Sequence, residues 1–176
     1  APNVDVGIAT TRLPLFLGSV ASFFAHDQSL DDMYRSIVDD SADRVVGVVR
    51  GVLADQPVLV HCTVGKDRTG VTVALVLAAA GVDEGDVVAD YARTESLLPA
   101  ERTEFVMRKV RDLHPHAKYA EDLIARSPAP VMRRLLDDLT SRFGSPADYL
   151  RAHGVADDEI AALRDVLVDR SRTSHL

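Results

Sequence analysis

Residues 61–70, HCTVGKDRTG, constrain the fold of this chain more than any other segment. They follow a short apolar run, PVLVH at 57–61, and lead into RTGVTVALVLAAAG at 68–81, which is apolar on nearly all sides. A short apolar run of this kind is typical of a strand buried on both faces, and a helix that is apolar all round belongs in a core. We therefore expect a strand, a loop and a buried helix, with Gly81 at the C-terminal cap of the helix.

Two segments near the start of the chain favour further strands. Val4, Val6 and Ile8 alternate with polar or small residues, and RLPLFL follows at 12–17. Alternation with a period of two is the pattern of a half-buried strand. Together with 57–61, these segments predict an α/β fold in which helices flank a central sheet.

Helical patterns fill most of the remaining sequence. Ser29 and Asp32 have the spacing of a capping box, so a helix is expected to begin near residue 30. A second helical stripe is expected to end before Pro57. After residue 83 every apolar pattern has helical spacing, which predicts a mostly helical C-terminal half. The length of 176 residues fits one domain, spanning 1–176.

Composition excludes several classes of function. The chain has 20 basic and 27 acidic residues, a net charge of −7, so a nucleic-acid partner is not expected. A single cysteine cannot form an intramolecular disulfide. No apolar stretch reaches the roughly 18 residues of a membrane span, and the first residues lack the features of a signal peptide. We expect no integral membrane segment, and either a cytoplasmic protein or one exported without a recognisable signal peptide.

The predicted loop has the features of an anion-binding site. A helix that begins near Arg68 would direct its first backbone N–H groups and its positive end towards the loop. The sequence is not a nucleotide-binding Walker motif, because Val60 stands where that motif needs its first glycine and Asp67 where it needs Ser or Thr. Instead, the thiol of Cys62 and the guanidinium of Arg68 would face the same bound oxyanion.

This loop resembles the His-Cys-x5-Arg signature of the cysteine-dependent tyrosine phosphatases. The match comprises His61, Cys62, Gly65, Arg68, Thr69 and Gly70. With DYARTES at 90–96 and GSPADYLRAHGV at 144–155, residues 30–168 are similar to bacterial tyrosine phosphatases that also act on lipids. Members of that family carry an additional N-terminal section with further strands, and nothing here corresponds to it. We therefore expect this phosphatase domain to lack that section.

The chemistry of the loop points to nucleophilic catalysis by Cys62. A helix N-terminus and nearby cations lower a cysteine pKa from about 8.5 to roughly 3.5–7.5, which makes the thiolate the resting form. In-line attack on a phosphate monoester would form a phosphocysteine. Thr69 is expected to donate its hydroxyl to the sulfur, and His61 to orient the loop and favour the thiolate.

The phosphate itself is expected to lie against the loop. Its oxygens would be held by the backbone amides and by the side chain of Arg68. The predicted substrate-binding residues are Thr63, Val64, Gly65, Lys66, Asp67 and Arg68. This chemistry needs no metal and no cofactor, and the HPH sequence at 114–116 is predicted to be a loop, not a metal site.

The leaving group needs a proton, and Asp67 is the carboxyl nearest to the nucleophile in sequence. Conventional tyrosine phosphatases supply the acid from a separate loop. In the inositide-specific myotubularins an aspartate before the signature arginine has that role, and the position of Asp67 is similar. Asp27, another residue of AHDQSLDD or the absent N-terminal section would be the alternative source.

The substrate class stays open at this stage. Lys66 would either bind a second phosphate of an inositol ring or remain a solvated lysine. The partners are therefore a phosphorylated protein, on phosphotyrosine or also on phosphoserine and phosphothreonine, or a phosphoinositide. Two other hypotheses are a catalytically inactive phosphate-binding module and a Cys62 that only fills the core.

Overall fold

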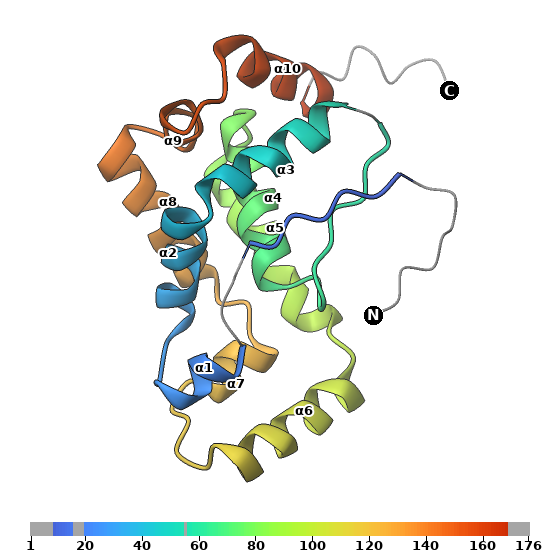
Figure 1. Ribbon diagram of the computed structural model, residues 1–176, viewed down its shortest axis with the longest axis vertical. Coiled ribbons are helices and arrows are strands. Elements are labelled where there is room, and N and C mark those ends of the chain that lie inside the picture. The colour runs from blue at the N-terminus through green and yellow to red at the C-terminus, as the bar shows by residue number, and fades with distance from the viewer. Residues whose placement is uncertain (1–8, 16–19, 55, 169–176) are drawn as a thin grey trace.

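Ten helices make up the regular structure of residues 9–15, 20–54 and 56–168, the parts of the chain that this computed structural model describes (Figure 1). Their bounds are α1 Val20–Ala25, α2 Leu30–Asp40, α3 Ala42–Ala54, α4 Asp67–Ala79, α5 Glu84–Leu97, α6 Ala100–Leu113, α7 Ala120–Ala125, α8 Ala129–Phe143, α9 Pro146–Ala152 and α10 Asp157–Leu167. The predicted helical C-terminal half is confirmed.

The predicted central sheet is wrong, because no strand occurs among the described residues. Residues 57–61 form an irregular segment, in which Val58 is 43% and Leu59 is 83% exposed, not a buried strand. A strand satisfies its backbone N–H and C=O groups only through a neighbouring strand, and the described chain offers none. The segment 12–17 is irregular as far as it is described, and Val4, Val6 and Ile8 lie outside the described residues.

Helix α4 lies at the centre of the packing, as its apolar sequence predicts. Its buried side chains include Val71, Ala74 and Leu75. Around it pack α2, α3, α5, α9 and α10 (Figure 1). The helix ends as expected, with Gly81 in the left-handed region at φ 88°, where a side chain would strain the backbone. The central helix thus fixes the position of the loop that precedes it.

The start of α2 confirms the predicted capping box. The Ser29 hydroxyl accepts a hydrogen bond from the backbone N–H of Asp32 at 3.2 Å, and the Asp32 carboxylate accepts one from the N–H of Ser29 at 2.9 Å. One face of the helix is buried, including Tyr34 and Ile37. The cap sets the register of α2, and this register directs the Tyr34 side chain into the core.

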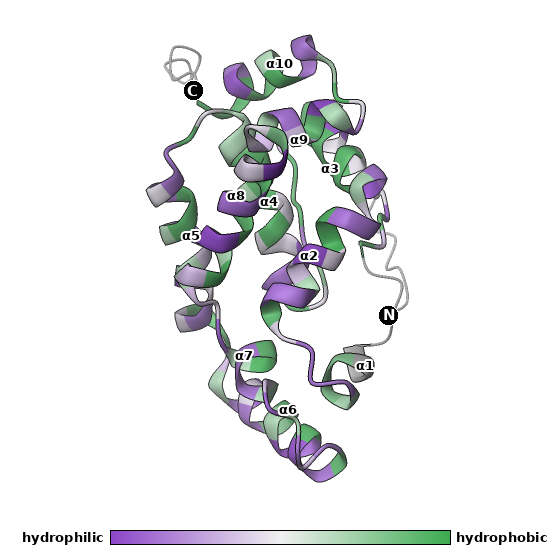
Figure 2. Cartoon of the chain, turned by 90° about the vertical axis from the view of Figure 1, so that its left-hand side faces the viewer, coloured by the Kyte–Doolittle hydropathy of each residue, from purple (hydrophilic) through white to green (hydrophobic). Residues whose placement is uncertain are grey.

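Helices α6 and α7 form an arm at one end of the molecule (Figures 1 and 2). Of the α6 residues only Val110 is buried, so this helix carries polar and apolar side chains on its surface. The HPH sequence at 114–116 forms the turn that follows α6, as predicted.

Among the described residues no helix is long and apolar enough to cross a bilayer. The same part of the chain contains no cluster of His, Cys, Asp and Glu that could hold a metal ion.

Candidate active site

The loop before α4 turns sharply at Gly65. This residue has φ 79°, a conformation that side chains other than glycine rarely adopt. The turn brings the backbone N–H of Gly65 to 3.2 Å from the sulfur of Cys62. Helix α4 begins at Asp67, one residue before the position expected from the sequence. The sulfur therefore lies at a turn of N–H groups that leads into a helix N-terminus.

The surroundings of Cys62 favour its thiolate. Partial burial raises the pKa of this thiol, but the Thr69 hydroxyl and the N–H groups of Thr69, Val64 and Gly65 outweigh burial and lower the pKa to about 7. The Thr69 hydroxyl oxygen is buried and has no hydrogen-bond partner among the described residues, so the hydroxyl is not engaged by another acceptor. At neutral pH a large fraction of Cys62 is therefore ionised and nucleophilic.

Arg68 and His61 border the same turn. A terminal nitrogen of Arg68 donates to the Thr63 hydroxyl at 3.1 Å, so both side chains lie over the loop. The His61 ring nitrogen Nδ1 lies 3.1 Å from the carbonyl oxygen of Cys62, and its side chain is exposed. The loop thus presents the sulfur, the guanidinium and the backbone amides on one short segment. The catalytic roles assigned to these residues stay predictions.

The side chain of Lys66 points into the protein and not into solvent, since the residue is only 1% exposed. Its ammonium donates to the Asp67 carboxylate at 2.7 Å, to the Arg126 carbonyl at 2.8 Å and to the Asp122 carbonyl at 3.2 Å. Of the two alternatives for Lys66, the solvated lysine is wrong. The three N–H bonds of the ammonium are all engaged, and two of them connect the loop to the end of α7.

Two tyrosines, to which the sequence alone assigns no role, form a hydrogen-bonded chain that ends at Asp67. The Tyr34 hydroxyl donates to Asp67 Oδ1 at 2.9 Å, and the Tyr91 hydroxyl is 2.6 Å from that of Tyr34. Tyr34 sits on an otherwise apolar face of α2, where a helical pattern predicts only a core residue. The one available signal was its hydroxyl, because a buried Tyr O–H needs a partner.

Asp27, the alternative acid, is occupied elsewhere. Its carboxylate accepts a hydrogen bond from the backbone N–H of Lys118 at 2.9 Å, between the end of α1 and the start of α7. No hydrogen bond or ion pair joins Asp27 to the 62–68 loop among the described residues. Of the two aspartates named from the sequence, Asp67 is the one that this structure places on the loop.

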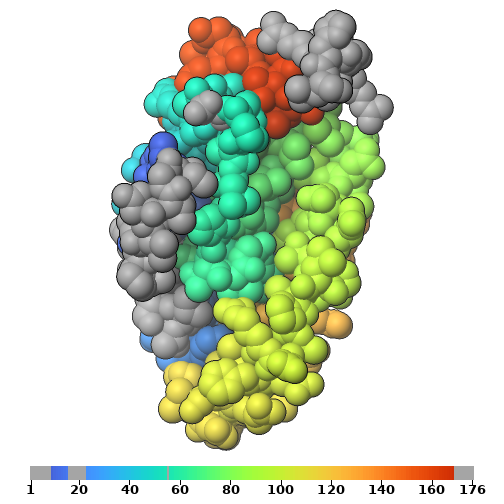
Figure 3. Space-filling view, turned by 90° about the vertical axis from the view of Figure 1, so that its right-hand side faces the viewer, coloured from blue at the N-terminus to red at the C-terminus, as the bar shows by residue number. Residues whose placement is uncertain are grey.

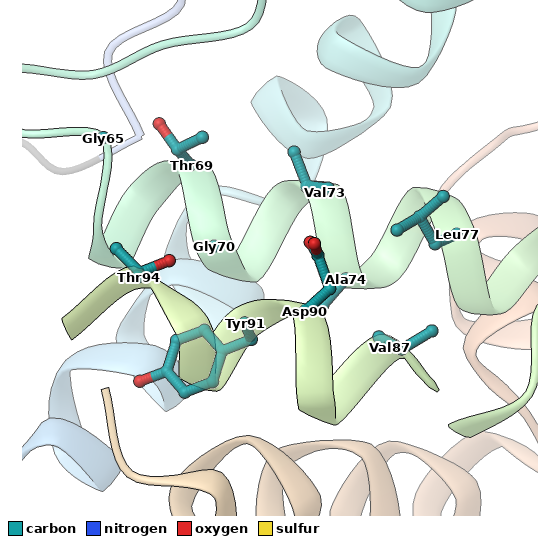
Figure 4. A pocket seen from close by; sticks show the side chains of 10 residues that line it. All are labelled: Gly65, Thr69, Gly70, Val73, Ala74, Leu77, Val87, Asp90, Tyr91 and Thr94. Carbon is teal, nitrogen blue, oxygen red and sulfur yellow. The ribbon is translucent and has the colours of Figure 1, made fainter. Parts of the chain in front are cut away.

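A groove of about 210 Å³ begins beside the loop, at Gly65 and Thr69 (Figure 4). Its apolar lining comes from α4, including Val73, and from α5, including Val87. Segment 56–66 and α5 lie on either side of α4 on this face (Figure 3). The loop and a mainly apolar groove therefore lie next to each other.

Gly70 allows α4 and α5 to approach closely under this groove. A Cβ at this position would lie 2.9 Å from the ring of Tyr91. Such a contact is too short for real side chains, so the last glycine of the signature is needed for helix packing. Tyr91, which lies in the DYARTES segment, is therefore fixed by the loop helix on one side and by Tyr34 on the other.

Comparison with known proteins agrees with this geometry. A family model described as "Tyrosine phosphatase family" matches residues 10–169. The triple specificity protein phosphatase PtpB of Mycobacterium tuberculosis is 33% identical over 130 residues, which cover 69% of this chain and 47% of that protein. A tyrosine-protein phosphatase of Nostoc commune is 30% identical over 141 residues, covering 77% of this chain and 48% of that protein. The chain spans about half the length of these curated relatives. The extent of the family match and the loop geometry together show that this chain belongs to the tyrosine phosphatase family.

Proposed function

We propose that this protein hydrolyses phosphate monoesters through a phosphocysteine on Cys62. The observation that carries the proposal is the pKa of about 7 of the Cys62 thiol, beside a backbone N–H and at the entrance to a helix N-terminus. A buried cysteine that only filled the core would not need donors aimed at its sulfur. A thiolate in this position is suited to attack phosphorus.

The reaction would proceed in two displacements. First, the Cys62 sulfur attacks phosphorus, the bond from phosphorus to the ester oxygen breaks, and Asp67 gives that oxygen a proton. Then a water oxygen attacks phosphorus, Asp67 takes a proton from the water, and the bond between sulfur and phosphorus breaks to restore the thiolate. Arg68 and the loop amides would stabilise the equatorial oxygens in both steps.

For the substrate, we propose phosphotyrosine first. The apolar groove beside Gly65 and Thr69 can contact an aromatic ring, and the Mycobacterium tuberculosis relative carries triple specificity in its name. Phosphoserine, phosphothreonine and phosphoinositides remain within the proposed range. However, Lys66 could bind a second inositol phosphate only by giving up one of its three buried acceptors. The proposal therefore assigns no second phosphate to Lys66 in this arrangement.

Phosphate release from a panel of phosphotyrosine, phosphoserine and phosphothreonine peptides and of phosphoinositides tests the proposal. We expect the largest kcat/KM on phosphotyrosine peptides and no release by the Cys62→Ser variant on any substrate. Vanadate binding without release by the parent protein would instead identify an inactive phosphate-binding module. Release that survives in Cys62→Ser would exclude the phosphocysteine route.

A further inference from the structure

The carboxylate of Asp67 is held by only one of its two oxygens. Oδ1 accepts from the Tyr34 hydroxyl at 2.9 Å and from the Lys66 ammonium at 2.7 Å. Within the described chain no hydrogen bond reaches Oδ2. The Asp67 side chain is 17% exposed, so it lies at the border between the buried network and the loop surface. The two oxygens of one carboxyl group thus have different environments.

The direction of the hydrogen bonds in this network is determined by proton count. A phenol has one proton, and Tyr34 gives its proton to Asp67, so the 2.6 Å contact with Tyr91 must be donated by Tyr91. Burial, followed by the nearby Asp67 carboxylate, raises the pKa of Tyr34 well above its usual value, and burial is also the main cause that raises the pKa of Tyr91. Both phenols therefore stay protonated, and each can donate.

We infer that Tyr34 is a positioning residue for proton transfer by Asp67, and that the Tyr91 hydroxyl holds Tyr34 in place by donating a hydrogen bond to it. Two donors on Oδ1 make it the accepting, carbonyl-type oxygen when Asp67 is neutral, and this leaves the proton on Oδ2. In the first displacement the Oδ2–H bond breaks as the ester oxygen gains the proton. In the second, Oδ2 takes a proton from the attacking water. The inference rests on the proposed function and extends it to α2 and α5, which do not contribute to the signature sequence.

The test is Tyr34→Phe, which keeps the ring and removes the donor to Asp67. We expect kcat on an alkyl phosphate to fall roughly tenfold, the scale of one hydrogen bond to an ionised group, with KM nearly unchanged. On p-nitrophenyl phosphate, whose leaving group needs little protonation, the loss should be less than about twofold. A role in stability alone would lower both rates by the same factor.

Tyr149→Phe is the matched control. Tyr149 is also fully buried, and its hydroxyl donates to the Val38 carbonyl of α2 at 2.8 Å, so this variant also removes one buried phenol hydrogen bond that involves α2, but away from the loop. It should reduce the free energy of unfolding in urea to a similar extent as Tyr34→Phe, and it should leave the ratio of the two substrate rates at the parent value.

A double variant separates positioning by Tyr34 from other effects. On an Asp67→Asn background, which cannot transfer the proton, Tyr34→Phe should cause no further loss on the alkyl phosphate. Equal losses on both substrates in the single variant, or a further tenfold loss in the double variant, would overturn the inference and leave the proposed function intact. If the parent protein shows no turnover that depends on Cys62, the proposed function is wrong, and the inference is wrong with it.

Discussion

The two halves of the 61–70 loop differ in their surroundings. In the first half, Cys62 is partly buried and Thr63 is exposed, and both accept hydrogen bonds from within the loop, from the N–H of Gly65 and from Arg68. The second half, at Lys66 and Asp67, is tied to α2 and to the end of α7 by side-chain hydrogen bonds. One short motif thus combines a nucleophile, whose surroundings the loop builds locally, with an anchoring half at Lys66 and Asp67, which depends on the tertiary fold.

The largest effect on function is expected from the first half. Cys62→Ser should abolish turnover at every pH, because a serine hydroxyl is not ionised where the thiol is. Its midpoint of urea unfolding should stay close to that of the parent, and vanadate binding should be retained through the amides and Arg68. An unfolding midpoint far below the parent value would show that the first half also anchors the fold.

EDTA should leave the activity of the parent protein unchanged, because the proposed reaction uses no metal ion.

Asp67→Asn tests a residue of the second half that both anchors the loop and is the proposed acid. We expect a loss of roughly 10²–10⁴-fold in kcat on an alkyl phosphate, the range for a positioned proton transfer, and a much smaller loss on p-nitrophenyl phosphate. Vanadate affinity, measured in parallel, shows that the loop has kept its shape. A loss of the same size on both substrates would mean that Asp67 only anchors.

Lys66→Met tests whether the anchoring half of the loop stabilises the folded protein. The variant keeps a long side chain and removes a buried ammonium with three acceptors, so we expect a loss of about 3 kcal/mol in the free energy of unfolding. Lys109→Met, at an exposed position of α6, is the control and should change this free energy by less than about 0.5 kcal/mol. Similar values for both variants would remove the distinction between the two halves.

The smallest expected effect is a shift in the titration of Cys62. Because its pKa is lowered to about 7, the rate of alkylation by iodoacetamide should rise with pH and reach half its maximum near pH 7. The alkylation of a free thiol would reach half its maximum rate at about pH 8.5. Thr69→Val removes a hydroxyl that lowers this pKa, so its midpoint should move to higher pH. A midpoint above pH 8 in the parent would contradict the local stabilisation of the thiolate.

The sequence predicted those features that depend on near neighbours in the chain. The capping box of α2, the glycine that ends α4 and the turn around Cys62 all arise from contacts within a few residues. The predicted strand at 57–61 was wrong, because a strand is stabilised by a partner elsewhere in the chain and a short apolar run does not reveal whether that partner exists. Composition and pattern gave no information on whether the described residues supply that partner.

The anchoring half of the loop shows the same limit. From the sequence, Lys66 would either bind a second phosphate or remain solvated, because lysine is rarely buried. In the structure, two of the three acceptors of its ammonium lie more than fifty residues away in sequence. Likewise, the contact between Tyr34 and Asp67 spans 33 positions, and no local pattern connects them. The chemistry of Cys62 and Arg68 was predictable from residue types at fixed spacing, and the support behind them was not.

The ammonium of Lys66 reaches α7 through the carbonyl oxygens of Asp122 and Arg126, not through their side chains. Every amino acid supplies a backbone carbonyl, so substitutions at these two positions leave both acceptors in place. The segment is therefore free to change its sequence while the loop remains attached to it. Only an insertion, a deletion or a movement of the backbone between α7 and α8 would detach it. Tolerance to substitution, combined with intolerance to changes in length, is the pattern that deep mutational scanning of residues 122–126 should reveal.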